Sequence, residues 1–416
     1  SYQVSPQGNV DWERHAMADS QTTTKTFEYR LRTNKKFVAA FEKALDDSRF
    51  VYNCALEQRI RVYNASGKTI SFYEQSRQLT EARNELPELK SVLRTIQSDA
   101  LERLDEAFDA FFRRLKSGEK PGFPRFKSRD RYHTFSQKYE KVRPCPIKGD
   151  KLTVPGVGAC RVRLSRPVEG RCKQLRITRR ADGWYVLLVC ETPTPEPLPP
   201  TGETVGVDVG IKSFATLSTG EEIANPRHLK QAADQLAREQ QHLSRKVKGS
   251  RNRKKARVKV ALRHLRVQRA RKHFHHEEAA KLVNRFDRIA VEDLNIRGMV
   301  KNRHLAKAIL DVAWGQFFAI TKGKAENAGR TFERVNPRYA TQTCSNCGHR
   351  QKMPLAIRIF ECEKCGFVCG RDHNAAINVD TVRSSGPKPD ACGERQRSKK
   401  QERDGRPQSE PQRGGD

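Results

Sequence analysis

Apolar residues recur at helical spacing through much of the first third of the chain. Between residues 36 and 126 they fall three or four positions apart, as at Phe37, Phe41 and Leu45, with polar residues between them. This period predicts helices that turn one face to a core. The stretch 118–124, with two glycines and two prolines, should end the last helix. We therefore expect a mostly helical lobe here.

The period then changes to two, which is typical of strands. Apolar residues alternate with arginines at 161–164, and two apolar runs flank Asp182 and Gly183, a pair that favours a hairpin turn. With a short apolar segment at 27–31, these runs predict a small β-barrel or sheet. Five prolines at 193–200 indicate a stiff linker after it.

Beyond the linker the pattern alternates between strands and helices. Short apolar runs predict strands at 204–209, 213–217, 288–292 and 331–335. Helical patterns fill 225–286 and 305–329, and Gly249 with Ser250 should divide the first of these into two helices. Such alternation is typical of an α/β domain.

Both ends of the chain lack this periodicity. Residues 1–24 begin without methionine, and we interpret them as disordered or as an added segment before a native start at Met17. Residues 384–416 hold only Ala391 and Cys392 as apolar residues, which predicts a disordered tail. No run of about 18 apolar residues exists, and a secretory signal is missing. We therefore expect no membrane association and a location in the bacterial cytoplasm or nucleoid.

The chain carries a large positive charge. Its 416 residues include 81 Lys and Arg against 49 Asp and Glu, a net charge of +32. The natural complement of such a charge is nucleic acid, ahead of an anionic membrane.

Fourteen of the basic residues, and no acidic one, lie between positions 245 and 272. A run of one sign repels itself and is favourable chiefly beside phosphates, although a solvated face is the alternative. A second segment, 123–127, interleaves basic residues with Phe123 and Phe126, which could stack on bases or belong to a core. The expected nucleic-acid contacts are Arg125, Lys127, Arg245, Lys246, Arg251, Arg253, Lys254, Lys255, Arg257 and Lys259.

Five of the eleven cysteines lie between positions 344 and 369. Four of them form two C-x-x-C-G knuckles with fourteen residues between Cys347 and Cys362, and four thiolates suit a tetrahedral zinc ion. The expected structural zinc ligands are Cys344, Cys347, Cys362 and Cys365. A closed site of this kind cannot be the catalytic metal. Cys369, His349 and His373 are near enough in sequence to substitute.

Three acidic residues suggest a second metal site. Asp208 and Glu292 lie in or at the end of predicted apolar strands, and Asp372 precedes the last predicted helix. A carboxylate in an apolar strand is costly unless it is paired or binds a cation. Carboxylate oxygens are the ligands of Mg²⁺, and two ions about 4 Å apart can activate water for attack on a phosphodiester. For any one of these acids alone, capping of a turn is the alternative.

In this order, the motifs resemble those of the TnpB proteins encoded by insertion sequences, compact RNA-guided nucleases related to type V CRISPR effectors. The resemblance covers about residues 24–383. It rests on the two cysteine knuckles and on the segments 49–53, 121–127, 205–217, 291–299, 301–306, 314–317 and 371–378.

The resemblance implies a multidomain fold of the α/β and α+β classes. An RNase H-like RuvC nuclease domain with an inserted zinc ribbon would follow a wedge β-barrel that carries an inserted helical recognition lobe. The implied ranges are 25–35 and 131–192 for the barrel, 36–130 for the recognition lobe, 193–202 for the linker, 203–340 and 370–383 for the RuvC domain, and 341–369 for the ribbon.

The resemblance also implies the function of an RNA-guided DNA endonuclease. Asp208, Glu292 and Asp372 would hold two catalytic Mg²⁺ ions, with Mn²⁺ able to substitute, and one Zn²⁺ would fill the ribbon. The partners would be a guide RNA from the transposon end and double-stranded DNA with a short flanking motif, bound by a monomer or a dimer. Residues that align with the motif-reading surface are Phe72, Ser76, Arg94, Thr95, Ser98, Ser136 and Gln137.

Three alternatives stay open. The first is a miniature type V CRISPR effector, which would share the chemistry. The second is a guide-dependent repressor that binds DNA without cleaving it, against which the three intact acids argue. The third is an unguided DNA-binding transposase, for which no separate nucleophile is evident.

Overall fold

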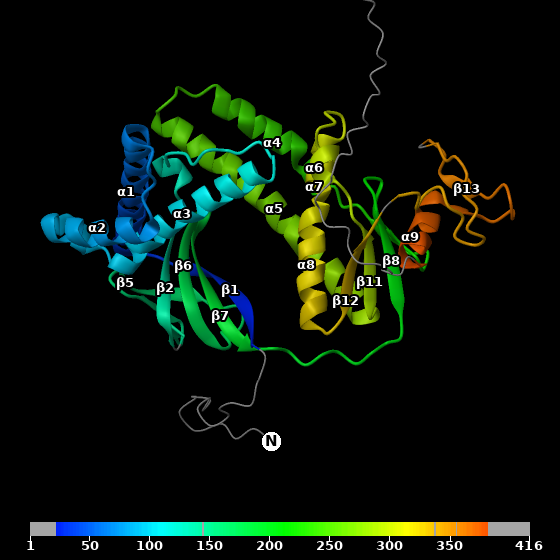
Figure 1. Ribbon diagram of the computed structural model, residues 1–416, viewed down its shortest axis with the longest axis horizontal. Coiled ribbons are helices and arrows are strands. Elements are labelled where there is room, and N and C mark those ends of the chain that lie inside the picture. Colours follow the sequence, from blue (N-terminus) through cyan, green and yellow to red (C-terminus); the bar gives the residue numbers. More distant parts are fainter. Residues whose placement is uncertain (1–21, 144, 337, 355, 382–416) are drawn as a thin grey trace, which may run out of the picture.

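The computed structural model describes residues 22–143, 145–336, 338–354 and 356–381. They form an N-terminal lobe (22–193) and a C-terminal lobe (204–381), joined by a linker (Figure 1). The predicted tail at 384–416, and residues 1–21 with Met17, lie outside the described residues. Within the described ranges, no helix is both long and apolar enough to cross a membrane.

The N-terminal lobe contains a seven-stranded sheet with the order β2-β6-β7-β1-β5-β4-β3. Its strands are β1 (Thr22–Arg32), β2 (Thr134–Arg143), β3 (Ile147–Lys148), β4 (Lys151–Val154), β5 (Gly158–Arg163), β6 (Arg171–Arg180) and β7 (Gly183–Pro193). In the part of the chain that is described, the two edge strands β2 and β3 do not pair with each other. The sheet is therefore a half barrel, and the prediction of a barrel holds only in that form.

Strand β1 begins earlier than expected. Thr22, Thr23 and Thr24 pair with the end of β7, so the prediction that residues 1–24 lie outside the fold is wrong for these three threonines. Their β-branched side chains favour a strand, although the segment has no alternation of apolar residues that would predict one. The hairpin predicted at Asp182 and Gly183 is confirmed as the turn between β6 and β7.

Helices α1 (Lys35–Ser66) and α3 (Arg94–Lys116) pack on this sheet, and α2 (Phe72–Glu85) packs on α3. Asn34 caps α1 by accepting a hydrogen bond from the Phe37 amide, and Gly67 ends the helix at φ 67°, where glycine is favoured. The ring of Phe41 contacts those of Phe135 and Trp184 on the sheet, with centroids 6.0 and 5.1 Å apart. The helices and the half barrel therefore share one core.

The C-terminal lobe is built on a five-stranded sheet with the order β10-β9-β8-β11-β12. Its strands are β8 (Thr204–Val209), β9 (Ser213–Leu217), β10 (Glu222–Ala224), β11 (Arg288–Glu292) and β12 (Thr331–Val335). The four longer strands match the predicted ones. Strands β8, β9 and β11 are apolar runs buried on both faces, whereas β12, at the edge of the sheet, is buried only at Val335. Strand β11 is parallel to both of its neighbours, β8 and β12.

Helices cover both faces of this sheet. The C-terminal part of α5 (Arg251–Arg285) and α8 (Trp314–Asn327) bury Ile289 and Val291 on one face. Helix α9 (Arg371–Thr381) buries Ala290, the intervening residue, on the other. Two short helices, α6 (Ile296–Met299) and α7 (Ala306–Val312), precede α8.

The single helix predicted over 305–329 is wrong. Ala313 adopts a left-handed conformation at φ 51° and separates α7 from α8. The break leaves the Val312 carbonyl free of the helix, and a ring nitrogen of His275 lies 3.0 Å from it. The turn also buries Trp314.

The long basic region forms a hairpin of α4 (His228–Ser244) and α5, which runs from one lobe to the other (Figure 1). The predicted break is confirmed: Gly249 has φ 86°, and the Ser250 hydroxyl caps α5 by accepting a hydrogen bond from the Arg253 amide. Arg257 bonds both oxygens of Asp130 at 2.8 and 3.0 Å. Arg269 bonds Asp182 at 2.8 Å, so α5 is fastened to the N-terminal lobe at two points.

Candidate functional site

The three predicted acids come together in the C-terminal lobe. In the parallel pairing of β8 with β11, Val207 is opposite Val291. Asp208 and Glu292 follow these two residues, so they lie side by side at the carboxyl end of the sheet. Asp372 lies in the first turn of α9, which packs across β8. Segments that are far apart in sequence thus place three carboxylates in one place.

Close packing of α9 on β8 depends on Gly206. A Cβ atom at this position would lie 2.0 Å from the Ala376 carbonyl oxygen and 2.5 Å from the Asp380 amide. Only glycine allows the helix to approach this closely. Farther along the helix, the Asp380 carboxylate accepts hydrogen bonds from Ser218 at 3.1 Å and Arg288 at 3.2 Å, which fixes the rotation of α9.

Burial and like charge act together on these acids. Burial raises the pKa of Asp208 well above its usual range, and the charges of Glu292 and Asp372 raise it further, while Arg371 opposes the shift. Burial and Asp372 raise the pKa of Glu292 to about 7. Carboxyl groups that repel one another in a buried place fit a site for divalent cations, which would neutralise them.

Two arginines hold Asp372, and sequence reasoning missed both. Arg371 donates from Nε and Nη2 to Oδ1 of Asp372 at 3.1 and 3.0 Å, and Arg358 lies 3.8 Å from Oδ2. The only signal in the sequence is the position of Arg371 directly before the acid. Arg358 lies fourteen positions before Asp372, between the two cysteine knuckles, and no pattern marks it.

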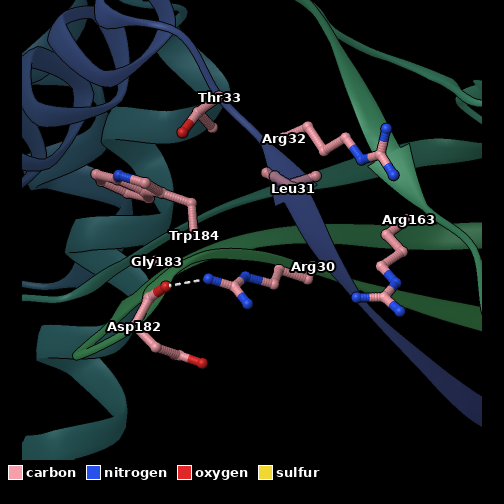
Figure 2. Close-up of a pocket in the computed structure, with 8 residues that line it drawn as sticks. All are labelled: Arg30, Leu31, Arg32, Thr33, Arg163, Asp182, Gly183 and Trp184. Carbon is pink, nitrogen blue, oxygen red and sulfur yellow. Dashed lines mark hydrogen bonds between the residues drawn. The ribbon is translucent and has the colours of Figure 1, made fainter. Parts of the chain in front are cut away.

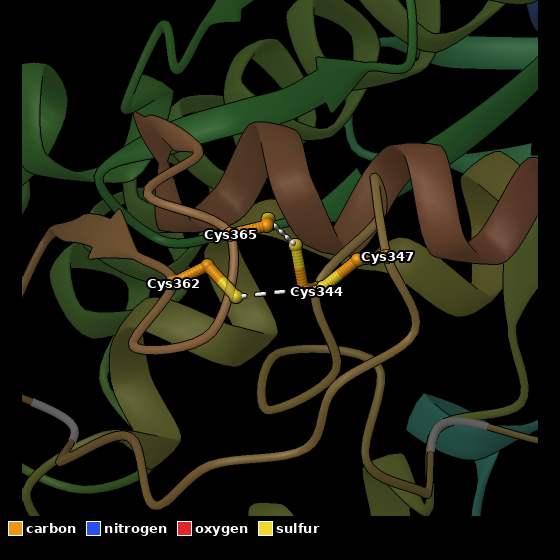
Figure 3. Close-up of side chains that lie close together, drawn as sticks. All are labelled: Cys344, Cys347, Cys362 and Cys365. Atoms are coloured by element: carbon orange, nitrogen blue, oxygen red, sulfur yellow. Dashed lines mark hydrogen bonds between the residues drawn. The ribbon is translucent and has the colours of Figure 1, made fainter.

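The four cysteines form one cluster (Figure 3). Their Sγ atoms all lie within 4.8 Å of one another, with 3.8 Å between Cys344 and Cys365 and 3.6 Å between Cys347 and Cys362. Four sulfurs at about 2.3 Å from a tetrahedral zinc ion would lie about 3.8 Å apart, so the set fits zinc. His373, considered as a substitute, instead lies 3.1 Å from the Ser218 carbonyl through Nε2.

Most of the predicted basic residues of the α4–α5 hairpin are exposed. They are Arg245, Arg251, Lys254, Lys255, Arg257 and Lys259, while Lys246 is half-buried. Arg253 has a different role from the one expected, because its Nη1 donates to the Leu243 and Lys246 carbonyls at 3.0 and 2.8 Å. It holds the turn of the hairpin, and Arg257 is engaged by Asp130.

The segment 121–127 is pinned to α1. Asn53 bonds both backbone groups of Lys127, donating to its carbonyl at 3.0 Å and accepting from its amide at 2.8 Å. Arg125 is exposed. Phe126 is 54% exposed and faces solvent, whereas Phe123, 49% exposed, packs edge-on against rings of α3, so each interpretation fits one ring. The Asp130 bond to Arg257 brings this segment beside α5.

Five of the seven expected motif-reading residues gather at the α2–α3 junction. Arg94 reaches from α3 to Ser76 on α2 at 3.2 Å. The five are Phe72, Ser76, Arg94, Thr95 and Ser98. The other two lie on β2 beneath α3: Ser136 is 1% and Gln137 6% exposed. Arg103 binds the Ser136 hydroxyl at 2.6 Å, so neither β2 side chain faces solvent in this structure.

A basic hollow of about 370 Å³ was not foreseen from the sequence (Figure 2). Arg30 and Arg32 come from β1 and Arg163 from β5, and Arg30 donates to the Asp182 carbonyl at 2.6 Å. Because Asp182 also binds Arg269 of α5, the hollow borders the junction of the two lobes. The alternation of arginines along β1 was the available signal.

Family models match three parts of the chain. A model described as a probable transposase matches residues 187–303, and one described as a Cas12f1-like TNB domain matches 314–379. A model described as a helix-turn-helix domain matches 20–68. In the structure this last range holds strand β1 and the single uninterrupted helix α1.

The fold is shared with a solved complex of Cas12f1, sgRNA and target DNA. The TM-score is 0.56 at 15% identity, over 86% of this chain and 99% of that one. The chain therefore has the fold class of the Cas12f1 chain in that complex.

Sequence relatives place the chain within that class. It is 35% identical to a Streptomyces pristinaespiralis protein named as an RNA-guided DNA endonuclease, over 90% of this chain and 92% of the relative. It is 28% identical to the Escherichia coli K12 protein InsQ, which carries the same description, over 89% and 94%. The chain belongs to the TnpB family of RNA-guided DNA endonucleases.

Replacement of Cys362 and Cys365 by serine should remove the zinc. Two thiolates would remain, and serine oxygen is a poor ligand, so the content should fall from about one zinc per chain to near zero. Elemental analysis of the purified protein measures this. Cys369→Ser is the matched control, because Cys369 packs in the ribbon without belonging to the cluster, and should keep the metal. Unchanged zinc in the double variant would refute the assignment.

Glu292→Gln should stabilise the magnesium-free protein at pH 8. Ionisation of Glu292, with a pKa of about 7 against its ordinary 4.5, costs the folded state free energy that grows as the pH rises between these values. The cost reaches up to about 3 kcal/mol above pH 7, and the neutral amide avoids it.

Thermal unfolding in magnesium-free buffer without chelator, which leaves zinc in place, measures the difference. The two proteins should unfold alike at pH 4.5 and differ at pH 8. Glu333→Gln is the control, since Glu333 pairs with Arg288 at 3.0 Å and its loss should lower the midpoint at pH 8. A Glu292→Gln protein less stable than the wild type at pH 8 would contradict the electrostatic account.

Proposed function

We propose that this chain is an RNA-guided DNA endonuclease whose active site is formed by Asp208, Glu292 and Asp372. The observation that carries the proposal is the convergence of these three acids from β8, β11 and α9 on one buried place, where their charges raise the pKa of Asp208 together. No structural role for the cluster is evident, because mutual repulsion of buried carboxylates destabilises the fold.

The three carboxylates would hold two Mg²⁺ ions, and Mn²⁺ could substitute. When bound, such ions activate water and stabilise the leaving oxygen in hydrolysis of a phosphodiester. The protein residues supply the rest: Asp208 and Glu292 must lose their protons to act as ligands, and Arg371 orients Asp372. One structural Zn²⁺ would occupy the four-cysteine cluster.

In this proposal the C-terminal lobe is an RNase H-like RuvC nuclease domain interrupted by a zinc ribbon. The half barrel is a wedge domain, and α1 to α3 form the recognition lobe. The guide RNA and its duplex with target DNA would lie along the exposed basic face of α5. The arginines of the hollow in Figure 2, Arg30, Arg32 and Arg163, would add phosphate contacts.

A short duplex motif beside the target would meet the α2–α3 junction. Arg94 and Thr95 are exposed there, and Phe72, Ser76 and Ser98 are half-buried beside them. Ser136 could take part only after α3 moves away from β2, because Arg103 of α3 covers it, and Gln137 is buried as well. Target sequence itself would be read by base pairing with the guide.

Asp208→Ala should abolish cleavage of a plasmid that carries the target and a library of flanking sequences. The assay contains purified protein, its transposon-end RNA and Mg²⁺. Loss of this carboxylate removes a ligand of the proposed metal site, so cleavage product should fall below detection. Guide RNA should still bind. Asp293→Asn is the matched control, because Asp293 is exposed beside Glu292 and should leave cleavage intact. Equal cleavage by wild type and Asp208→Ala would reject the site.

Joint replacement of Lys254, Lys255 and Lys259 by alanine should make RNA binding less sensitive to salt. Each lost phosphate contact reduces the slope of log Kobs against log salt by about 0.7 to 0.9, so the slope should fall by about 2 to 3. Filter binding between about 50 and 200 mM salt measures it. The control is a triple variant of lysines that already pair with carboxylates: Lys25, Lys173 and Lys322. An unchanged slope would remove α5 from the RNA-binding surface.

A further inference from the structure

The helix that carries Asp372 begins where the ribbon ends. The ribbon contains a small antiparallel pair, β13 (Ile359–Glu361) and β14 (Val368–Gly370), and α9 starts at the residue after β14. Asp372 is therefore reached by the chain only after the four cysteines. Its place in the sheet depends on how α9 and the ribbon are joined.

Asn374 holds the backbone on both sides of the first zinc ligand. Its Oδ1 accepts a hydrogen bond from the Ser345 amide at 2.9 Å, and its Nδ2 donates to the Thr343 carbonyl at 2.7 Å. Cys344 lies between these two residues. Asn374 is 0% exposed and lies two positions after Asp372 on α9. The side chain therefore ties the position of Cys344 to the first turn of α9.

Other α9 groups strengthen this junction. Arg371 donates from Nη1 to the Ile357 carbonyl at 3.1 Å while it also holds Asp372. Asn378, one turn after Asn374, donates to two carbonyls at the ribbon entrance, those of Ala340 at 2.8 Å and Thr343 at 2.7 Å. The ribbon is thus bonded to the same helix turns that set Asp372 against β8.

We propose that Asn374 is a positioning residue that couples the zinc cluster to Asp372, so that a filled zinc site raises the affinity of the acidic site for divalent cations. The inference rests on the proposed function, since it takes Asp372 as a metal ligand. Zinc would fix the conformation of the knuckle that contains Cys344. The two hydrogen bonds of Asn374 hold this knuckle against α9, and α9 fixes the position of the Asp372 carboxylate. Because coupling between two sites is reciprocal, cations at the acidic site should also raise the affinity of the cysteine cluster for zinc.

The chemistry of the amide explains why asparagine serves here. The junction needs one acceptor for the Ser345 amide and one donor for the Thr343 carbonyl, both from one short side chain. Aspartate supplies only acceptors when ionised, and alanine supplies neither group. Glutamine would add a methylene group that a fully buried position has no room for.

Gln351 provides a matched control within the ribbon. Its side chain binds the backbone of the second knuckle in the same way. It donates to the Glu361 carbonyl at 2.6 Å and accepts from the Glu363 amide at 3.0 Å, and these two residues flank Cys362. Gln351 is not on α9. Its replacement therefore removes the same kind of bonds from the zinc cluster without breaking the link to Asp372.

The experiment measures Mn²⁺ binding by electron paramagnetic resonance of the full chain without RNA. Six proteins are compared: wild type, Asn374→Ala, Gln351→Ala, Asp372→Asn, Cys362→Ser with Cys365→Ser, and that double variant with Asn374→Ala. Zinc content and thermal midpoint are measured for each. Asn374→Ala should keep its zinc and bind Mn²⁺ about 10- to 100-fold more weakly, the loss typical when a group that orients a metal ligand is removed. Gln351→Ala should bind Mn²⁺ like the wild type.

The combined variant carries the decisive comparison. Zinc loss alone should weaken Mn²⁺ binding by a factor similar to that of Asn374→Ala, and adding Asn374→Ala to it should cause no further loss, because the two changes break one connection. The inference would be overturned if the losses of Mn²⁺ affinity from zinc removal and from Asn374→Ala multiplied in the combined variant. It would also be overturned if Asn374→Ala bound Mn²⁺ as tightly as the wild type. Asp372→Asn separates the two proposals: if it leaves Mn²⁺ binding unchanged, the proposed acidic site itself is wrong.

Discussion

The mutual repulsion of Asp208 and Glu292 is the constraint on which the C-terminal lobe depends. Two carboxylates at the ends of adjacent parallel strands, largely removed from water, make the fold less stable unless cations join them. The surrounding structure holds them there nevertheless: parallel pairing sets them side by side, Gly206 admits α9, and Asp380 bonds to Arg288 and Ser218 at the far end of that helix. The fold therefore tolerates this repulsion, and divalent cations at the three acids would relieve it.

The positive charge of the chain lies mostly at the surface, in contrast to the buried carboxylates. Most of the α5 cations face solvent, where repulsion among them is weakened by water and salt, and some are used to connect the lobes. Arg257 with Asp130 and Arg269 with Asp182 join α5 to the N-terminal lobe, and Arg330 joins the proline-rich linker to the C-terminal lobe through the Pro199 carbonyl at 2.7 Å. A polyanion along α5 would thus meet a surface that belongs to both lobes.

The sequence predicts elements well where local chemistry determines them. Strands β8, β9 and β11 are apolar runs, the α4–α5 turn carries Gly249 and Ser250, and the four-cysteine cluster follows from cysteine spacing. Prediction from the sequence fails where contacts between distant residues determine the conformation. The left-handed Ala313 has no local signal, and the His275 ring beside the Val312 carbonyl is distant in sequence. Ser136 is covered by Arg103 of α3, and Arg358 reaches Asp372 only after the ribbon folds back. The three acids could be named from the sequence, but the arginines around them could not.

The position of the ribbon within the chain acquires a physical meaning from these contacts. An insertion between β12 and α9 could in principle leave the sheet unaffected, as a loop on the surface does. Here the insertion enters at Ala340 and Thr343, whose carbonyls bind Asn378, and leaves directly into the residue before Asp372. The same helix therefore closes the ribbon and completes the acidic site. A cysteine cluster that orders its own loop also restricts the start of α9, so the stability of the knuckles and the geometry of the third carboxylate cannot vary independently.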